Sequence, residues 1–106
     1  MVKRGDIWLV QLDPAGGRKI GLPHPCVVVS PPEMLDHLRT VLVAPMSSKA
    51  LVMPFRVPVT LAGVRGSILL EQLRAVDTAR LVKRLGAVSA KTLTATLDTL
   101  QEMFAQ

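Results

Sequence analysis

The sequence predicts a mainly β fold of the α+β class, a small and strongly bent antiparallel sheet or partly open barrel with one helix packed on it. Three observations support this prediction. The Val, Leu and Ile runs are short and bounded by proline and glycine, which is typical of strands joined by tight corners. Only the C-terminal end has a long helical period. With 106 residues the chain is expected to be one domain, residues 1–106.

The predicted strands follow in order from apolar runs that end in turn-forming residues. The first covers residues 5–12 and is closed by the turn sequence Asp13-Pro-Ala-Gly-Gly17, after which a loop continues to Pro25. Residues 26–30 contain three consecutive valines and form a second strand, and residues 33–38 have room for one helical turn. The remaining predicted strands are residues 39–46, 55–59, 66–77 and 81–88.

The last predicted element is a helix over residues 90–105. Ser89 is a good N-cap, because its hydroxyl can accept a hydrogen bond from the first turn. The apolar residues follow the spacing i, i+4, i+7, i+11, which predicts a stripe packed on the core: Leu93, Leu97, Leu100 and Phe104.

Composition limits the possible partners. Lys and Arg number 13 against 8 Asp and Glu, a formal charge of +5, which favours a polyanion such as nucleic acid or an acidic protein segment. Cys26 is the only cysteine, so an internal disulfide and a thiolate zinc site are excluded, and a reducing cytoplasm is expected. It begins a strand without an evident base partner, which indicates a core residue. No apolar stretch approaches the ~20 residues that span a bilayer, so no membrane partner is expected.

The predicted strand over residues 66–77 is unusual, because Glu71, Gln72 and Arg74 interrupt an otherwise aliphatic run. Either Glu71 pairs with an arginine while Gln72 and Arg74 reach solvent, or the three line a polar pocket. Alternation puts Glu71 on one face and Gln72 with Arg74 on the other, so a shared pocket requires a bend. Asp77 can then cap a short helical turn at residues 78–81.

Five ordered sequence blocks resemble the MazF/PemK toxins of bacterial toxin–antitoxin systems, and together they cover nearly the whole chain. The blocks are Arg4-Gly-Asp-Ile-Trp-Leu-Val-Gln-Leu-Asp-Pro14, Pro25-Cys-Val-Val-Val-Ser30, Val43-Ala-Pro-Met-Ser-Ser48, Pro54-Phe-Arg-Val-Pro-Val59 and Glu71-Gln-Leu-Arg-Ala-Val-Asp77. The resemblance implies an SH3-like, partly open barrel of the PemK/CcdB type with a C-terminal amphipathic helix. It also implies a homodimer that cleaves single-stranded RNA without a metal or other cofactor and is neutralised by an acidic antitoxin.

The resemblance assigns site residues unevenly. Catalytic roles fall on His24, where the family has an arginine, and on Ser47, where it has a threonine. The family's Glu-Gln pair is retained as Glu71-Gln72, whereas the usual first-loop glutamate is Lys19 here. The expected RNA-binding residues are Arg18, Lys19, Lys49, Glu71, Gln72 and Arg74.

The exchange of arginine for histidine leaves three roles open for residue 24. His24 can transfer protons while Arg18, Lys19 or Arg74 supplies charge, it can be a weak substitute in a slow enzyme, or the site can be inactive. Two other functions therefore remain beside RNA cleavage. They are a catalytically impaired module that binds RNA or antitoxin, and a CcdB-like gyrase poison.

Overall fold

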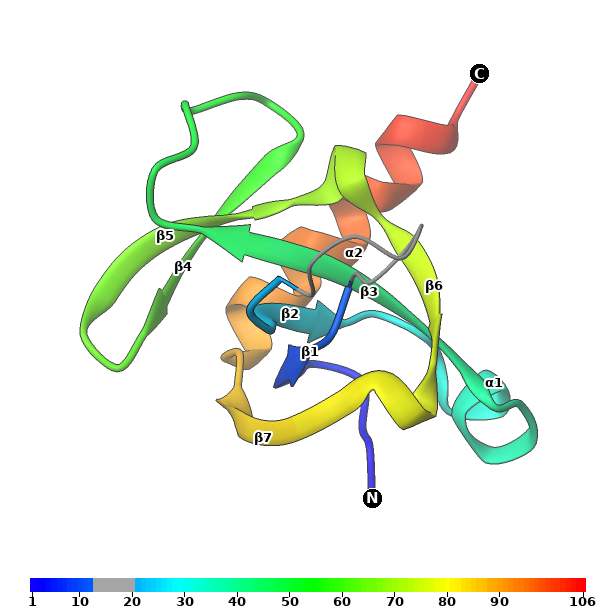
Figure 1. The fold of residues 1–106 in the computed structure, drawn as a ribbon. Helices are drawn as coiled ribbons and strands as arrows, with labels where there is room; N and C mark the ends of the chain where they lie inside the picture. Colours follow the sequence, from blue (N-terminus) through cyan, green and yellow to red (C-terminus); the bar gives the residue numbers. More distant parts are fainter. Residues whose placement is uncertain (13–20) are drawn as a thin grey trace.

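Seven strands form one antiparallel sheet in the computed structural model, which describes residues 1–12 and 21–106 (Figure 1). The strands are β1 (Asp6–Val10), β2 (His24–Val28), β3 (Thr40–Ser47), β4 (Arg56–Leu61), β5 (Val64–Leu69), β6 (Arg74–Asp77) and β7 (Leu81–Ala87). The helical elements are α1 (Pro32–His37), the 3₁₀ turns η2 (Leu70–Gln72) and η3 (Thr78–Arg80), and α2 (Ala90–Phe104). The mainly β prediction with a C-terminal helix is therefore confirmed.

The sheet curls because β3 is shared between two sets of neighbours. The strand order is β4-β5-β3-β2-β1-β7, and β6 pairs with β3 outside this path. Residues 40–43 of β3 pair with β6, whereas Met46 and Ser47 at its end pair with β5. The long strand β3 therefore holds both sides of the bend, and its end at Ser47 lies where the two parts of the sheet meet.

The prediction of one strand over residues 66–77 was wrong. The chain forms β5, turns through η2 at Leu70–Gln72, and resumes as β6. Both halves pair with β3, so the interruption turns a corner of the barrel while most backbone groups keep partners. The predicted turn after this segment is confirmed, since the Asp77 carboxylate accepts a hydrogen bond from the Ala79 amide at 2.8 Å.

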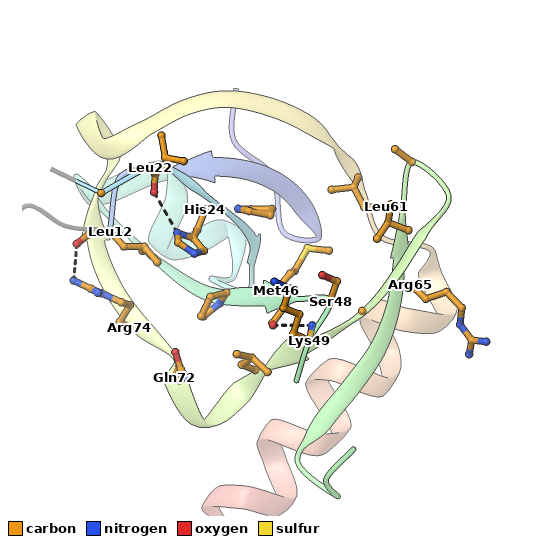
Figure 2. Close-up of a pocket in the computed structure, with 18 residues that line it drawn as sticks. Leu12, Leu22, His24, Met46, Ser48, Lys49, Leu61, Arg65, Gln72 and Arg74 are labelled. Carbon is orange, nitrogen blue, oxygen red and sulfur yellow. Dashed lines mark hydrogen bonds between the residues drawn. The ribbon is translucent and has the colours of Figure 1, made fainter. Parts of the chain in front are cut away.

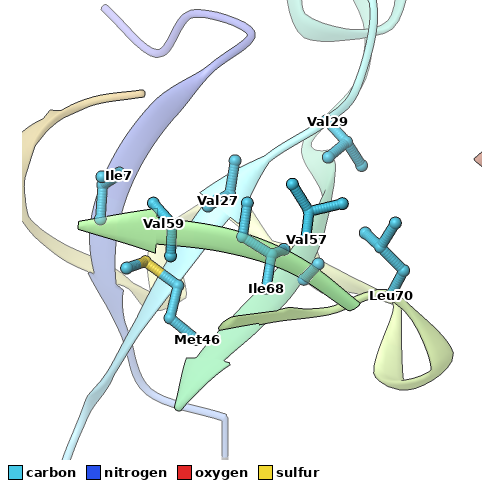
Figure 3. Packing of buried hydrophobic residues seen from close by; sticks show 9 residues of the cluster. Ile7, Val27, Val29, Met46, Val57, Val59, Ile68 and Leu70 are labelled. Atoms are coloured by element: carbon cyan, nitrogen blue, oxygen red, sulfur yellow. The ribbon is translucent and has the colours of Figure 1, made fainter. Parts of the chain in front are cut away.

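Among the described residues, the core consists of two clusters on opposite faces of the segment that begins with β2. Val27 and Val29 belong to one cluster, and Cys26 and Val28 belong to the other. Figure 3 shows how the first cluster joins side chains from several strands, among them Ile7, Val57 and Ile68. Burial on both faces explains why this strand is a continuous apolar run instead of an alternating one.

The helix α2 begins as predicted, because the Ser89 hydroxyl accepts a hydrogen bond from the Thr92 amide at 3.1 Å. Leu93, Leu97 and Leu100 are half-buried, and Leu100 packs against the first core cluster. The prediction that Phe104 is packed in the core was wrong, since its side chain is 73% exposed. Figure 1 shows the reason: the last turn of α2 projects beyond the sheet. None of the helices among the described residues is long and apolar enough to cross a membrane.

Candidate functional site

A cavity of about 710 Å³ opens where β2 begins and β3 ends, between the β4–β5 hairpin and β6 (Figure 2). Much of its wall is aliphatic: Leu12, Leu22, Pro45, Leu61, Val64 and Leu69. Its polar lining consists of His24, Ser47, Ser48, Lys49, Gln72 and Arg74, with Arg65 at the hairpin. No carboxylate lies among the lining residues in the part of the chain that the structure describes, so the cavity favours an anionic ligand.

The pairing of β2 with β3 places His24 and Ser47 at one end of the sheet. The two strands are antiparallel, and Cys26 lies opposite Pro45. His24 is two residues before Cys26, and Ser47 is two residues after Pro45. Because neighbouring antiparallel strands run in opposite directions, the first residue of β2 and the last residue of β3 come to the same edge. The two predicted catalytic residues therefore line the same cavity.

The imidazole of His24 has a defined hydrogen bond. Its Nδ1 lies 3.2 Å from the carbonyl oxygen of Leu22, shown as a dashed line in Figure 2. A carbonyl oxygen can only accept, so Nδ1 must carry the hydrogen of this bond. In the neutral ring Nε2 then keeps its lone pair. The exposed His24 ring is thereby prepared to accept a proton at Nε2.

The hydroxyl of Ser47 is held at the end of β3. Its Oγ accepts a hydrogen bond from the Lys49 amide at 3.1 Å, which closes a local turn over Ser47–Lys49. The bond uses one lone pair of the oxygen and leaves the hydroxyl hydrogen available. Ser47 is half-buried, whereas Lys49 is exposed. This turn therefore carries a hydroxyl donor and a cation two residues apart.

Gln72 and Arg74 reach the cavity from the end of η2 and the start of β6. The Arg74 Nη2 donates to the Leu12 carbonyl at 3.1 Å, which ties the segment after β1 to β6 (Figure 2). Gln72 is exposed and lines the cavity with an amide. Gln72 and Arg74 therefore share the cavity, as alternation along the segment predicted, but the pocket shared by all three polar residues is not formed.

Glu71 does not line the cavity. Its carboxylate pairs with Arg56 of β4, with 2.6 Å between Nη2 and Oε2 and 3.1 Å between Nε and Oε2. The hydrogen bonds and charge of Arg56 lower the pKa of the Glu71 carboxyl below its ordinary value. The same guanidinium donates from Nη1 to the Leu51 carbonyl at 2.9 Å. Glu71 therefore joins η2 to β4, as the ion-pair interpretation predicted. Glu71 and Gln72 are consecutive residues of this 3₁₀ turn, but only Gln72 lines the cavity.

Three further sequence predictions concern Arg18, Lys19 and Cys26. Arg18 and Lys19 lie outside the described residues. Cys26 is fully buried, and this burial raises the pKa of its thiol to about 12, as expected of a core cysteine that is not a nucleophile. Among residues 1–12 and 21–106, no three His, Cys, Asp or Glu side chains are grouped so that they could hold a metal ion.

Arg65 and the aliphatic wall were missed at the sequence level. Arg65 lies in β5 beside the β4–β5 turn, a segment that the sequence marks only as a connection. In Figure 2 its side chain points away from the centre of the cavity. Leu61 and Leu69 resemble ordinary strand residues, and nothing in a local pattern indicates that they border a cavity.

Comparison with known proteins gives concordant results. The model of the family "PemK-like, MazF-like toxin of type II toxin-antitoxin system" matches residues 3–104. A relative, "Endoribonuclease MazF9" of Mycobacterium tuberculosis, is 38% identical over 104 residues, which cover 88% of this chain and 87% of the relative.

Solved structures with a similar fold include two toxins. "Mycobacterium tuberculosis toxin MazF-mt6" has a TM-score of 0.77 at 19% identity and covers 93% of this chain and 95% of its own. A MazE-MazF structure from Deinococcus radiodurans has a TM-score of 0.79 at 22% identity, and the match covers 99% of this chain and 96% of that chain. At these identities the two structures support the fold alone.

Proposed function

We infer the chemistry of this cavity from one premise: the chain belongs to the family of PemK-like, MazF-like toxins of type II toxin–antitoxin systems. It is a MazF-like endoribonuclease toxin that a cognate antitoxin neutralises. The family match favours RNA cleavage over the CcdB-like gyrase poison that the fold alone also allows. We propose that it acts in the cytoplasm on single-stranded RNA, without a metal ion, at the cavity between β2, β3 and β6.

The observation that supports this proposal most strongly is the meeting of His24 and Ser47 in a cavity whose charged lining is basic. RNA contains its own nucleophile, the 2′-hydroxyl next to each phosphate. An enzyme therefore needs only a group that accepts the 2′ proton and donors around the phosphorus. The free Nε2 of His24 can accept the 2′ proton. The donors around the phosphorus are Ser47, Lys49 and Arg74.

In the proposed step, Nε2 of His24 takes the proton of the 2′-hydroxyl as the 2′-oxygen attacks the adjacent phosphorus. The bond between phosphorus and the 5′-oxygen breaks, which leaves a 2′,3′-cyclic phosphate and a 5′-hydroxyl. The departing 5′-oxygen takes a proton from solvent, and the proton on His24 returns to solvent, so the ring ends as it began. The Ser47 hydroxyl and the Arg74 guanidinium stabilise the negative charge on the phosphoryl oxygens.

The aliphatic wall suits the bases of an unpaired strand. Bases that are not stacked in a duplex expose apolar faces, which Leu61 and Leu69 can cover without an aromatic residue. The Gln72 amide offers one donor and one acceptor group for the edge of a base. In this proposal Glu71 contributes indirectly, since its ion pair with Arg56 holds η2 where Gln72 faces the cavity.

Cleavage of a labelled single-stranded RNA in EDTA tests the proposal. We expect wild-type rates in EDTA and products with a 2′,3′-cyclic phosphate and a 5′-hydroxyl, identified by mass spectrometry. A double-stranded RNA of the same sequence is the matched control and should remain intact, because its bases are paired. Activity that disappears in EDTA and returns with Mg²⁺ would contradict the metal-independent mechanism.

We further propose a homodimer whose cavities bind an acidic segment of the antitoxin. Large apolar side chains are exposed in the β3–β4 loop and at the end of α2, including Leu51 at 71%, Val52 at 95% and Phe104 at 73%. Their burial between two copies would remove this surface from water. Light scattering should give the mass of two chains for the protein alone. In a separate test of antitoxin binding, added antitoxin should inhibit cleavage less at high salt. A monomer at micromolar concentration would contradict the dimer.

A further inference from the structure

Gly66 in β5 lies against the backbone of the Ser47–Lys49 turn. A Cβ at this position would be 2.7 Å from the Ser47 carbonyl oxygen, 3.1 Å from the Ser47 carbonyl carbon and 3.3 Å from the Ser48 Cα. Real Cβ atoms essentially never approach another heavy atom to less than 3.0 Å. The obstructing atoms belong to the backbone, so a side chain at position 66 would force one of the two segments to move.

Close packing against a neighbouring backbone, and not backbone conformation, explains why residue 66 is a glycine. Gly63 in the same hairpin has a φ of +79°, and no atom lies within 4 Å of the place that a Cβ would occupy, so this glycine provides a turn conformation. The φ of Gly66 is not positive, and backbone atoms of the Ser47–Ser48 peptide fill the space beside its Cα. A glycine inside a strand often marks the close approach of another backbone. The predicted start of this strand at residue 66 was also wrong, since β5 begins at Val64.

The close approach occurs at the point where β3 enters the cavity. Ser47 pairs with Ser67 of β5, and Gly66 is the next residue of β5 beyond this pair. It therefore covers the peptide between Ser47 and Ser48. The direction of the Ser47 hydroxyl depends on this peptide, because its Oγ is bonded to the Lys49 amide in the same turn. Figure 2 shows this bond as the dashed line at Lys49.

We propose that Gly66 is a positioning residue for RNA cleavage. Its missing side chain lets β5 close onto the Ser47–Ser48 peptide and fixes the direction of the Ser47 hydroxyl and the Lys49 amide. The inference rests on the proposed role of Ser47 and adds Gly66, a residue at the cavity wall that acts through the Ser47–Lys49 turn. A displacement of a catalytic donor by about 1 Å can cost up to ~100-fold in rate, so one added methyl group is enough to be measured.

The test compares Gly66→Ala with Gly63→Ala, which adds the same methyl group to the same hairpin outside the cavity. We expect Gly66→Ala to lower kcat about 10-fold with KM within about 2-fold of wild type. Gly63→Ala should lower the melting temperature through its strained φ and leave kcat unchanged below the transition. Gly66→Ala with wild-type kcat would overturn the proposal.

A double-mutant cycle separates positioning from a general loss of structure. If Gly66 acts through the Ser47 hydroxyl, adding Gly66→Ala to Ser47→Ala should lower the rate no further. Losses that multiply would overturn the inference but leave the role of Ser47 intact. A Ser47→Ala variant as active as wild type would instead remove the proposed function on which the inference rests.

Hydrogen exchange supplies a readout that does not depend on activity. The Lys49 amide should be protected in the wild-type protein and should exchange faster in Gly66→Ala, because the turn that it closes is displaced. If Gly66→Ala does not fold, the exchange rate of the Lys49 amide in the wild-type protein still tests the proposal. A Lys49 amide that exchanges at the rate of an unstructured peptide would show that β5 does not hold this turn.

Discussion

Replacement of His24 by alanine is expected to lower the rate of RNA cleavage about 100-fold or more at pH 7. The imidazole is the group in the cavity prepared to accept the 2′ proton, because its Nδ1 donates to the Leu22 carbonyl and Nε2 is free. Alanine removes this acceptor and leaves the donors on the phosphate in place. Single-turnover rates on a short RNA, with binding measured separately, check the prediction.

The pH profile makes this prediction specific for proton transfer. A general base accepts a proton only in its unprotonated form, so the wild-type rate should rise as the pH is raised from acidic values. The residual rate of His24→Ala should lack this rise. A wild-type rate that is flat with pH and that survives the alanine substitution would eliminate the role of His24 in proton transfer.

His24→Arg is the matched variant for the alternative roles of this residue. Arginine is a permanent cation with two-pronged donor geometry, and we expect it to be about 10-fold or more faster than alanine through phosphate stabilisation. A rate above wild type would identify His24 as a weak substitute in a slow enzyme. Cleavage by the arginine variant alone, with an inactive wild type, would indicate a module that binds RNA or antitoxin without cutting.

The second large effect is expected at Ser47. Ser47→Ala should lower kcat about 100-fold, the magnitude typical of removing one donor to a charge that develops in the transition state. Binding of uncleavable RNA should change little, because the cations and the aliphatic wall remain. Ser47→Thr keeps the hydroxyl and should retain most of the activity. Rates with Ser47→Ala and Ser47→Thr on the same RNA are the measurement.

Ser89→Ala is the control for loss of a serine hydroxyl. Ser89 caps α2 through the Thr92 amide and does not line this cavity. The alanine variant should lose about 1 kcal/mol of folding stability and keep wild-type cleavage below its melting transition. Equal losses of cleavage at Ser47 and Ser89 would mean that stability, and not phosphate contact, limits the reaction.

Local patterns predicted most of the fold because they act over a few residues. The three consecutive valines at the end of β2 and just after it predict burial on both faces, and the structure places them in two core clusters. The Ser89 and Asp77 caps were predictable for the same reason, since each bond spans two or three residues. The resemblance to the toxin family added His24 and Ser47, and the structure places both at the same cavity.

Local sequence patterns could not predict contacts between residues that are far apart in the sequence. The interruption of the predicted strand at Leu70–Gln72 depends on β3 offering one edge to both β5 and β6. The partner of Glu71 is Arg56, fifteen residues away, and only the folded hairpin brings the two together.

The sequence by itself determined most of the strand segments, where the helix begins and that the protein is basic. These properties follow from hydrophobic period, capping and charge, which a chain carries before it folds. The tertiary structure alone decided that Arg56 is the partner of Glu71, that Phe104 stays exposed, and that Gly66 must lack a side chain. Each of these depends on how closely two segments approach in space, and packing distances are properties of the assembled sheet.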